Sequence, residues 1–383
     1  MEGKVKRFNG IKTARSQFPA EENSAYYLIS SKIKGDRRTM PFFSRFKPAA
    51  KILLRGETKK KTRSPIPAIT AEEVAEARSF FPRDKFFIFG HARSGTTLLT
   101  RLARLHPEVH CNYQAHFFTR KPLLKSLVNT HEAEEWLTRK SNRWNQGRDL
   151  SPLVLRVAAD FIMERDAARE GKMIVGDKSP SSTIHGQAVR DMHDVYPDAK
   201  LVYIVRDGRD VLVSERFRNF VEESKFLTSE DKRIIADLKV DPAPFENGSR
   251  SIFTETFIRR VAKGWVANLQ ETEGEGRRLF GENYFHLRYE DLLAHPFDEM
   301  SKFWKFLGVK KIQKSLDKTL CDEMASNPDE EWQSKRNEGI ASFLPKGQAG
   351  NWARLFTEKD KSVFKEVAGE MLVKWEYEKD LNW

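Results

Sequence analysis

The sequence predicts an α/β fold, a three-layer α/β/α arrangement in which helices cover both faces of a central parallel sheet. Three observations support this prediction. Short apolar runs recur along the chain, each run ends in a turn rich in glycine or charge, and apolar residues at helical spacing follow the turns. Because parallel strands need a crossover, this alternation is typical of a parallel sheet, whose ligands gather at the carboxyl ends of the strands.

The first two strand–helix units lie at 86–105 and at 173–195. Their strands are the apolar runs 86–89 and 173–175, and a glycine-containing turn follows each of them. Helix faces then appear at spacings of three and four residues, formed by Leu98, Leu102 and Leu105 in the first unit and by Ile184, Ala188, Met192 and Val195 in the second. These units place two glycine-containing turns at the same edge of the predicted sheet.

The remaining elements follow the same reasoning. The run 201–205 is the clearest strand, and the charged turn 206–210 leads from it into further apolar residues. A shorter strand is predicted at 284–287 and a helix at about 300–307. A last helix carries Phe364, Val367, Met371 and Trp375 on one side.

Positive charge is concentrated near the N-terminal end. Residues 1–65 hold 17 Lys and Arg against 5 Asp and Glu, a net charge of +12, whereas the rest of the 383-residue chain holds 50 of each. We therefore predict a basic, partly flexible extension at residues 1–80 and one functional domain at residues 81–383. The extension is either a tail without a fixed partner or a contact for an anionic surface, such as lipid, nucleic acid or an acidic acceptor.

Composition also restricts the compartment. No apolar run approaches the roughly 20 residues of a membrane span, so no transmembrane segment is predicted and we expect a soluble, cytoplasmic protein. An organelle transit peptide is the alternative, although Glu21, Glu22 and Asp36 fit its acid-poor composition badly. Cys111 and Cys321 offer neither a disulfide framework nor clustered metal ligands, which predicts a metal-free fold.

The segment 86–99 has the layout of a P-loop-like phosphate site, with a buried strand, a glycine-bounded loop and a helix start. Backbone N–H groups, two hydroxyls and the helix dipole would face the anion, and Arg93 would add a permanent charge. The alternative is a glycine-rich turn that only packs helix on strand. The Walker pattern requires a lysine where Thr96 stands, so binding of an ATP γ-phosphate with magnesium is not expected.

Two further segments carry cationic groups. Arg206 ends its strand, and Ser214 and Arg218 follow on one predicted helix face, so the three could converge on a second phosphate. Alternatively, the arginines pair with neighbouring carboxylates on a solvated face. The segment 346–352 combines Lys346 with two glycines and Trp352 and has no helical or strand period, so it is either a lid over a ligand or a surface loop.

Together these motifs resemble the PAPS-dependent sulfotransferases, which move a sulfuryl group from 3′-phosphoadenosine 5′-phosphosulfate (PAPS) to an acceptor. The resemblance spans roughly residues 85–375 and is closest in motif style to the bacterial, tyrosylprotein and glycan branches. Ala92 replaces a common proline, and Pro345 stands where the cytosolic branch has a lid arginine. The resemblance implies a metal-independent enzyme with PAPS as co-substrate, bound by Arg93, Ser94, Gly95, Thr96, Thr97, Arg206, Ser214, Arg218, Tyr289, Lys346 and Gly347.

The resemblance also implies how the transfer is catalysed. Lys178, after the second strand, is similar to the lysine that stabilises the bridging oxygen or the sulfuryl group, and Arg93 would hold the phosphosulfate. The alternative is a surface lysine paired with Asp177.

The resemblance also bears on the general base. It implies a glutamate where Gln114 stands, and an amide cannot accept a proton as a carboxylate can. On an extended segment His116 would lie on the same side as Gln114, and imidazole titrates near neutrality, so we predict His116 as the substitute base. His116 could instead be structural, and His185 and Tyr113 are held in reserve.

Two other functions compete with the sulfotransferase. A P-loop-type kinase or NTPase would require magnesium, and a non-catalytic nucleotide-binding protein of the same fold would explain the loss of a carboxylate at Gln114. The acceptor stays open among sugars, peptide tyrosines, lipids and small alcohols. Trp136 and Trp144 could stack on a sugar ring, but we expect them to pack against the core.

Overall fold

The structure is a computed structural model that describes residues 63–142, 144–222, 227–326 and 347–383. The chain divides into two units at Lys60 and Lys61, and the second unit, Lys61–Trp383, contains all the described residues. Helix α2 (Ala71–Phe80) belongs to this unit and packs against α5 (Ser151–Arg169). The start of the functional domain at residue 81 stays a prediction.

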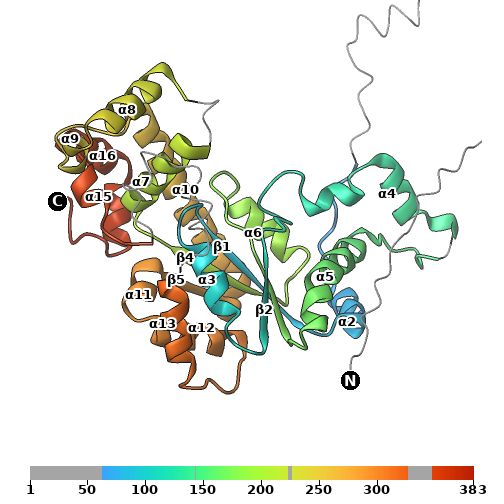
Figure 1. Cartoon of the computed structure of the whole chain (residues 1–383). Coiled ribbons are helices and arrows are strands. Elements are labelled where there is room, and N and C mark those ends of the chain that lie inside the picture. Colours follow the sequence, from blue (N-terminus) through green and yellow to red (C-terminus); the bar gives the residue numbers. More distant parts are fainter. Residues whose placement is uncertain (1–62, 143, 223–226, 327–346) are drawn as a thin grey trace, which may run out of the picture. The chain divides into compact units, whose positions relative to one another are not determined.

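Five parallel strands form the central sheet of the second unit, in the order β2-β3-β1-β4-β5 (Figure 1). The strands are β1 (Asp84–Gly90), β2 (Val109–Tyr113), β3 (Ile174–Lys178), β4 (Lys200–Val205) and β5 (Tyr284–Arg288). Every pairing in this sheet is parallel. Since β1 lies between β3 and β4, the carboxyl ends of three strands that carry the predicted turns are neighbours.

Helices cover both faces of the sheet. The long helices begin at side-chain caps in several cases, as in α10, where the Thr254 hydroxyl accepts the Phe257 N–H. The remaining elements are α3 (Thr96–Ala103), η2 (Leu124–Val128), α4 (His131–Thr138), η3 (Lys140–Asn142), α6 (Gly186–His193), α7 (Gly208–Glu222), α8 (Ser229–Val240), α9 (Ala243–Glu246), α10 (Glu255–Phe280), η5 (Gly281–Asn283), α11 (Tyr289–Ala294), α12 (Pro296–Leu307), α13 (Leu316–Ala325), α15 (Trp352–Leu355) and α16 (Glu358–Lys374).

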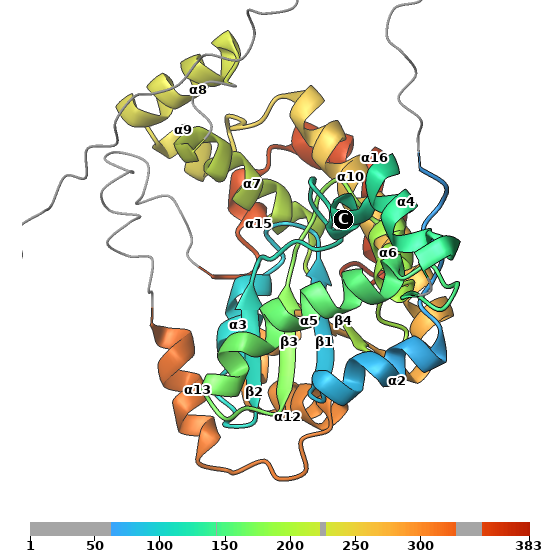
Figure 2. The same ribbon diagram turned by 90° about the vertical axis from the view of Figure 1, so that its right-hand side faces the viewer.

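Alternation along the strands creates two hydrophobic cores, one on each face. Phe87 and Leu201 point into the core formed with α5, α6, α7, α10 and α16, whereas Phe86 and Ile88 point into the core formed with α3, α11 and α12. Figure 2 shows α5 lying across the first of these faces and α7 and α15 above the strands. The structure confirms the predicted three-layer α/β/α fold with a central parallel sheet.

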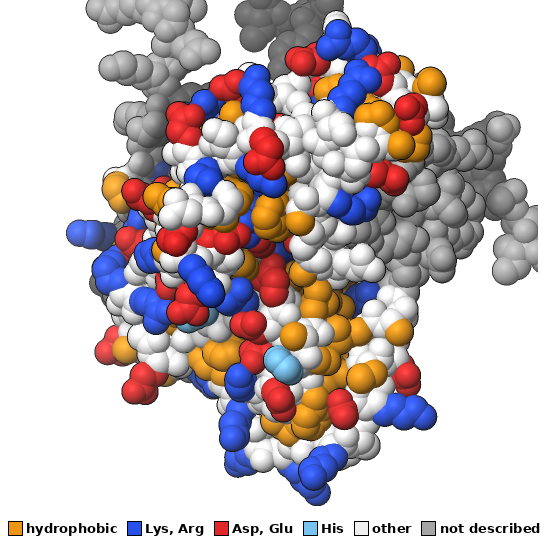
Figure 3. Space-filling view, turned by 90° about the vertical axis from the view of Figure 1, so that its left-hand side faces the viewer, with side chains coloured by type: hydrophobic (Ala, Val, Ile, Leu, Met, Phe, Trp, Pro, Cys, Tyr) orange, Lys and Arg blue, Asp and Glu red, His pale blue; other side chains and the backbone are white. Residues whose placement is uncertain are grey.

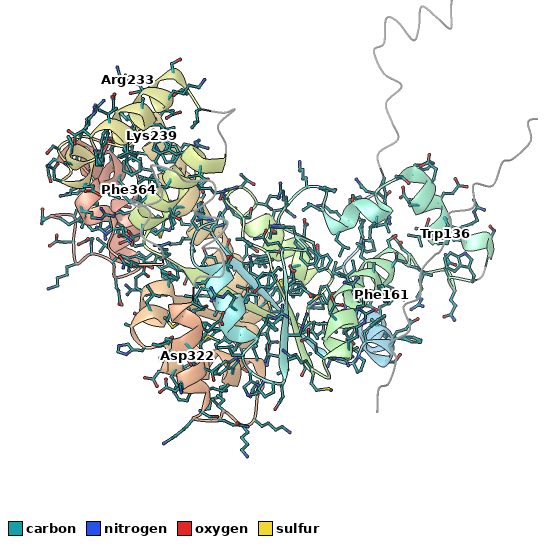
Figure 4. The ribbon with its side chains drawn as sticks, viewed as in Figure 1. Trp136, Phe161, Arg233, Lys239, Asp322 and Phe364 are labelled. Atoms are coloured by element: carbon teal, nitrogen blue, oxygen red, sulfur yellow. The ribbon has the colours of Figure 1, made fainter. Side chains whose placement is uncertain are left out.

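The sequence reasoning missed several elements, among them α2, β2, α4, α5, α8 and α10, and misplaced one pair of aromatics. Edge strand β2 is short, and the sequence reasoning did not use the Thr254 N-cap and the Gly281 C-cap that bound α10. Trp136 and Trp144 do not pack in the core: they are 58% and 45% exposed and stack on each other, with ring centroids 5.4 Å apart. Figure 4 shows Trp136 on α4, on the side away from the sheet.

The face carrying α8, α9 and α16 shows interspersed acidic and basic side chains (Figure 3).

Candidate functional site

The predicted anion-binding turns meet at the carboxyl edge of the sheet. The phosphate loop follows β1, Lys178 ends β3, Arg206 follows β4, and Tyr289 follows β5. Lys178 lies beside Ile88 of β1 in the register, and the end of β1 pairs with Ile204 of β4. The strand order therefore brings together residues that are up to two hundred positions apart in the sequence.

The phosphate loop bends sharply into α3. Arg93 and Gly95 both have positive φ, at 72° and 86°, and Gly95 is the N-cap of the helix. A Cβ on Gly95 would lie 2.2 Å from Cδ2 of Tyr289, so only glycine fits against this ring. Arg93 and Thr97 are exposed, whereas Ser94 is only 1% exposed. The loop thus presents one guanidinium and one hydroxyl outward at the positive end of a helix.

The residues of the predicted second anion subsite surround Arg206, which is 8% exposed. Its guanidinium lies 4.7 Å from the centroid of the Tyr289 ring and donates to the carbonyls of Arg93 at 3.1 Å and Gln348 at 3.0 Å. Arg93 Nε donates to Ser214 Oγ at 3.0 Å. The structure therefore brings Arg93, Arg206, Ser214 and Tyr289 together.

Arg218 lies further along α7. Its guanidinium is 3.7 Å from the carboxylate of Glu215, and one third of its side chain is exposed. Helix α7 begins at Gly208, so Ser214 lies nearly two turns inside the helix and Arg218 one turn beyond that. This arrangement combines the two sequence hypotheses. Arg206 and Ser214 both contact Arg93, while Arg218 lies beside the carboxylate of Glu215 and Arg206 lies 4.0 Å from that of Asp210.

The predicted lid segment is attached to this subsite. The Tyr289 hydroxyl donates to the Gly347 carbonyl at 2.9 Å. Asp210 accepts the backbone N–H groups of Gly350 at 2.7 Å and Trp352 at 3.1 Å, and burial raises the pKa of its carboxyl. Lys346 lies outside the described residues. Asp210 was not predicted as a functional residue, although its place in the charged turn after β4 could have suggested it.

Two buried polar atoms at this edge fit an anionic ligand. Among the described residues, the Ser94 hydroxyl and Arg206 Nε are buried without a hydrogen-bond partner. Buried donors are normally satisfied, so an unpartnered hydroxyl at a helix N-terminus and an unpartnered guanidinium N–H suit phosphate oxygens. The donor set therefore fits an anionic ligand such as a phosphate group.

Lys178 is nearly fully buried, at 1% exposed, beside the phosphate loop. Its ammonium donates to Thr97 Oγ1 at 3.2 Å and lies 5.4 Å from the centroid of the Tyr113 ring. Burial lowers the pKa of this lysine. Lys178 therefore faces the phosphate loop. It is not a solvated surface lysine paired with Asp177, which was the alternative that the sequence left open.

Asp177 points to the opposite face of the sheet and was missed by the sequence reasoning. Its carboxylate accepts the Ala115 N–H at 2.9 Å and the Ser179 hydroxyl, and Ser179 Oγ accepts the His116 N–H at 2.9 Å. Burial raises the pKa of Asp177 to about 6. These bonds fix the backbone of the segment that carries the predicted base. The alternation of side chains on β3 could have indicated this role.

The segment 114–116 is not extended, and that part of the prediction is wrong. Gln114 and His116 both have positive φ, at 58° and 53°, because the chain turns sharply after β2. His116 Nδ1 is 2.8 Å from Thr119 Oγ1. Burial, followed by the charges of Arg120 and Lys178, lowers the pKa of His116. A lowered pKa leaves the imidazole neutral at pH 7, which is the form that accepts a proton.

The two reserve residues lie in different surroundings. His185 Nδ1 accepts a hydrogen bond from the Asn268 amide at 3.1 Å, and burial lowers its pKa. Tyr113 is 48% exposed, and burial of the remainder raises the pKa of its hydroxyl. Compared with His185 and Tyr113, His116 is the better candidate for the general base, because its pKa is lowered and the charge of Lys178 acts on it.

Other features of the described residues lie apart from this edge. A pocket of about 340 Å³ lies between the segment 63–67 and Phe117, Phe118 and Leu124, and no predicted site residue lines it. Among these residues, no three His, Cys, Asp or Glu side chains group to hold a metal ion. Within the same part of the chain, no helix has the length and apolar character needed to cross a membrane.

Comparisons with known proteins find related sequences. Protein-tyrosine sulfotransferase A of Caenorhabditis elegans is 25% identical over 235 residues, which is 60% of this chain and 51% of the relative. Human sulfotransferase 1C2 is 26% identical over 178 residues, 44% of this chain and 53% of the relative. The chain thus spans about half the length of these relatives. Mouse sulfotransferase SULT7A1 complexed with PAP aligns with a TM-score of 0.42 and 17% identity, over 79% of this chain and 90% of that one.

A family profile covers the edge described above. The profile of the sulfotransferase family matches residues 85–314, which is more than half of the chain. The matched range includes the phosphate loop, Lys178, Arg206, Ser214 and Tyr289. On this match and the geometry of the phosphate loop, the chain belongs to the sulfotransferase family.

Proposed function

We propose that this protein transfers a sulfuryl group from PAPS to a hydroxyl or amine acceptor. The observation that carries the proposal is the meeting of Arg93, Arg206 and Ser214 at one edge of the sheet, where the Ser94 hydroxyl and Arg206 Nε are buried without partners. Two adjoining groups of cationic and hydroxyl donors, one on the phosphate loop and one at the start of α7, suit a nucleotide with phosphate groups at both its 3′ and 5′ positions.

Donor binding is divided between the two subsites. The loop from Arg93 to Thr97 holds the 5′-phosphosulfate through backbone N–H groups, hydroxyls and the helix dipole. Arg206 and Ser214 hold the 3′-phosphate, with Arg218 a further contact on the same helix. Tyr289 lies against the nucleotide, and Gly347, whose carbonyl accepts a hydrogen bond from the Tyr289 hydroxyl, belongs to the segment that covers it.

In the transfer step the acceptor oxygen or nitrogen bonds to sulfur while the bond between sulfur and the phosphate oxygen breaks. Lys178 and Arg93 stabilise the negative charge that develops on the departing oxygen, so no metal ion is required. The acceptor proton passes to Nε2 of His116, because Nδ1 is engaged with Thr119. The products are the sulfated acceptor and 3′-phosphoadenosine 5′-phosphate (PAP).

The donor site is tested by titration calorimetry, with PAP and 5′-AMP in the absence of metal and with ATP in the presence of magnesium. A clear preference for PAP is expected, because only PAP fills both cationic subsites. A preference for ATP with magnesium would instead support a P-loop kinase and contradict the proposal.

A second candidate is a nucleotide-binding protein without turnover. The observation that favours it is the amide of Gln114 at the position where the family is expected to have a carboxylate. The two candidates differ in one measurement, the transfer of labelled sulfate from PAPS to a panel of acceptors. Peptide tyrosines come first in that panel because a matched relative is a protein-tyrosine sulfotransferase, and sugars, lipids and small alcohols follow.

The basic residues 1–65 are proposed to contact an anionic surface. Their net charge of +12 would attract such a surface at low salt and lose most of that attraction at high salt. Sedimentation with anionic vesicles at two ionic strengths tests this contact, with neutral vesicles as the control. Equal sedimentation with both vesicle types would contradict it.

A further inference from the structure

Arg209 lies in the first turn of α7 and is 2% exposed. Its guanidinium donates to both oxygens of Asp207, at 3.0 Å and 2.7 Å, and to the carboxylate of Glu378. It also lies 3.7 Å from the centroid of the Trp352 ring and 4.6 Å from that of Trp383. Arg209 therefore joins the turn after β4, the start of α15 and the segment 375–383.

A second link runs from the same segment to the start of α11, directly after β5. The Tyr377 hydroxyl donates to Glu290 Oε2 at 3.0 Å, and Glu290 Oε1 accepts the Asp207 N–H at 3.0 Å. Glu290 directly follows Tyr289, whose ring lies against Gly95 and whose hydroxyl holds the Gly347 carbonyl. Two independent contacts therefore converge on the turn 206–210.

The segment 375–383 is itself fixed on α16. Lys365 Nζ donates to the carbonyl of Trp383 at 2.5 Å and lies 4.9 Å from the centroid of its ring. Leu381 packs so closely on the helix that a Cβ on Gly369 would lie 2.9 Å from its Cδ2 atom. Helix α16 packs in turn on α10, whose Trp265 donates to the Arg206 carbonyl at 3.0 Å. The segment is thus anchored on the same framework as the anion subsite.

We propose that residues 375–383 are a positioning element of the nucleotide site, which acts through Arg209 and Glu290 to hold the turn 206–210 and the segment 347–352 in the geometry of the 3′-phosphate subsite. The inference rests on the proposed function. Arg209 is a positioning residue, since its buried guanidinium is directed at Asp207 and Glu378 and not at the ligand edge. Asp210 transmits the effect because it holds the N–H groups of Gly350 and Trp352.

The test uses two variants of the full chain, Glu378→Gln and Trp383→Ala. Glu378→Gln removes one ionic partner of Arg209 but leaves the pair with Asp207, and its side chain is partly exposed, so folding is expected to survive. Trp383→Ala changes no charge. The matched controls are Glu376→Gln and Trp136→Ala, because both side chains are exposed.

Two readouts are measured on each variant. In the nucleotide-free protein, hydrogen–deuterium exchange of the peptide 347–355 is expected to speed up in the two variants and to stay unchanged in the controls. In calorimetry, the preference for PAP over 5′-AMP is expected to fall by about tenfold, since only PAP uses the 3′-phosphate subsite. A purely electrostatic effect of Glu378→Gln would have the opposite sign, because loss of a negative charge strengthens phosphate binding.

Each outcome decides the inference. Unchanged exchange and an unchanged nucleotide preference in both variants would overturn it, and so would an equal loss of affinity for both nucleotides, which indicates general destabilisation. If the unaltered protein shows no preference for PAP, the proposed function fails, and the exchange of 347–355 alone then decides whether the segment positions that region.

Discussion

Lys178 is a cation held in a nearly water-free position at the end of β3. Its burial lowers the pKa, and an anion placed against Thr97 and the phosphate loop would favour the charged form again. Lys178→Ala is expected to lower kcat by about 10²–10³-fold, because the ammonium acts on charge that develops only in the transition state. The affinity for PAP, measured by calorimetry, should change little.

A matched control for this substitution lies on β4, which β1 separates from β3. Lys200 begins β4 at the other edge of the sheet and donates to the Phe306 carbonyl. Lys200→Ala is expected to leave kcat unchanged even if stability falls. Full activity in the Lys178→Ala variant would remove Lys178 from the mechanism.

His116 gives the proposed reaction its pH dependence. Burial, then Arg120 and Lys178, lower the pKa of the imidazole, so the free base persists below the usual histidine value of 6.5. The rate should therefore stay level near pH 7 and be lost as the pH falls through the lowered pKa, which lies below 6.5. In His116→Gln this acidic limb should disappear and kcat should drop by about 10²-fold in a pH–rate profile.

Gln114 offers a rescue experiment for the same group. Adding Gln114→Glu to the His116→Gln variant supplies a carboxylate at the position the family pattern predicts, and part of the rate should return. A His116→Gln variant that keeps the acidic limb would show that another group accepts the proton.

The phosphate loop and α3 form one element whose shape depends on Gly95. Its φ of 86° and the Tyr289 ring 2.2 Å from a Cβ position both exclude a side chain. Gly95→Ala should weaken PAP binding by more than tenfold and lower the free energy of unfolding, because Tyr289 would have to move away from Arg206. Calorimetry and urea unfolding measure the two effects.

A control substitution at Gly171 distinguishes the two causes expected for Gly95→Ala, backbone strain and the steric clash with Tyr289. Its φ is 68°, but nothing lies within 4 Å of a Cβ at that position. Gly171→Ala should cost about 1 kcal/mol of stability from strain alone and leave PAP binding unchanged. Equal effects of the two substitutions on PAP binding would show that the contact between Gly95 and Tyr289 has no role in the site.

The stability of the whole molecule is coupled to pH through Asp177. Burial raises its native pKa from 3.8 to about 6, so the folded state binds the proton more tightly than the unfolded state. The stabilisation that comes from this tighter proton binding is fully present at low pH, and it declines as the pH rises from about 4 to about 6. A shift of about two pKa units corresponds to about 3 kcal/mol.

Asp177→Asn mimics the protonated form at every pH. Relative to the unaltered protein, the variant should gain stability from about pH 4 to about pH 6, and the difference should then stay constant. Urea unfolding across this range measures it. Asp166→Asn is the control, because a hydrogen bond from Arg165 lowers the pKa of Asp166 and its trend has the opposite sign. A parallel pair of stability curves for Asp177→Asn and the unaltered protein would contradict the prediction.

Local pattern in the sequence was enough to predict the fold class, the phosphate loop, and the turns that carry Lys178 and Arg206. Hydrophobic period and glycine placement act over a few residues, and the parallel sheet then requires these turns to share one edge. Periodicity could not predict the sharp turn at Gln114 and His116, because the backbone N–H groups of this turn donate hydrogen bonds to Asp177 and Ser179, more than 60 positions away.

The tertiary structure decided the contacts that complete the site. Arg93 reaches Ser214 across 121 positions, and Arg209 reaches Glu378 across 169. Such pairs leave no local signal, since one buried guanidinium can be matched by any carboxylate or aromatic ring that the packing brings to it. The sequence alone therefore determined which chemistry is present at the edge of the sheet, and only the packing of α7, α15 and α16 determined which groups hold it in place.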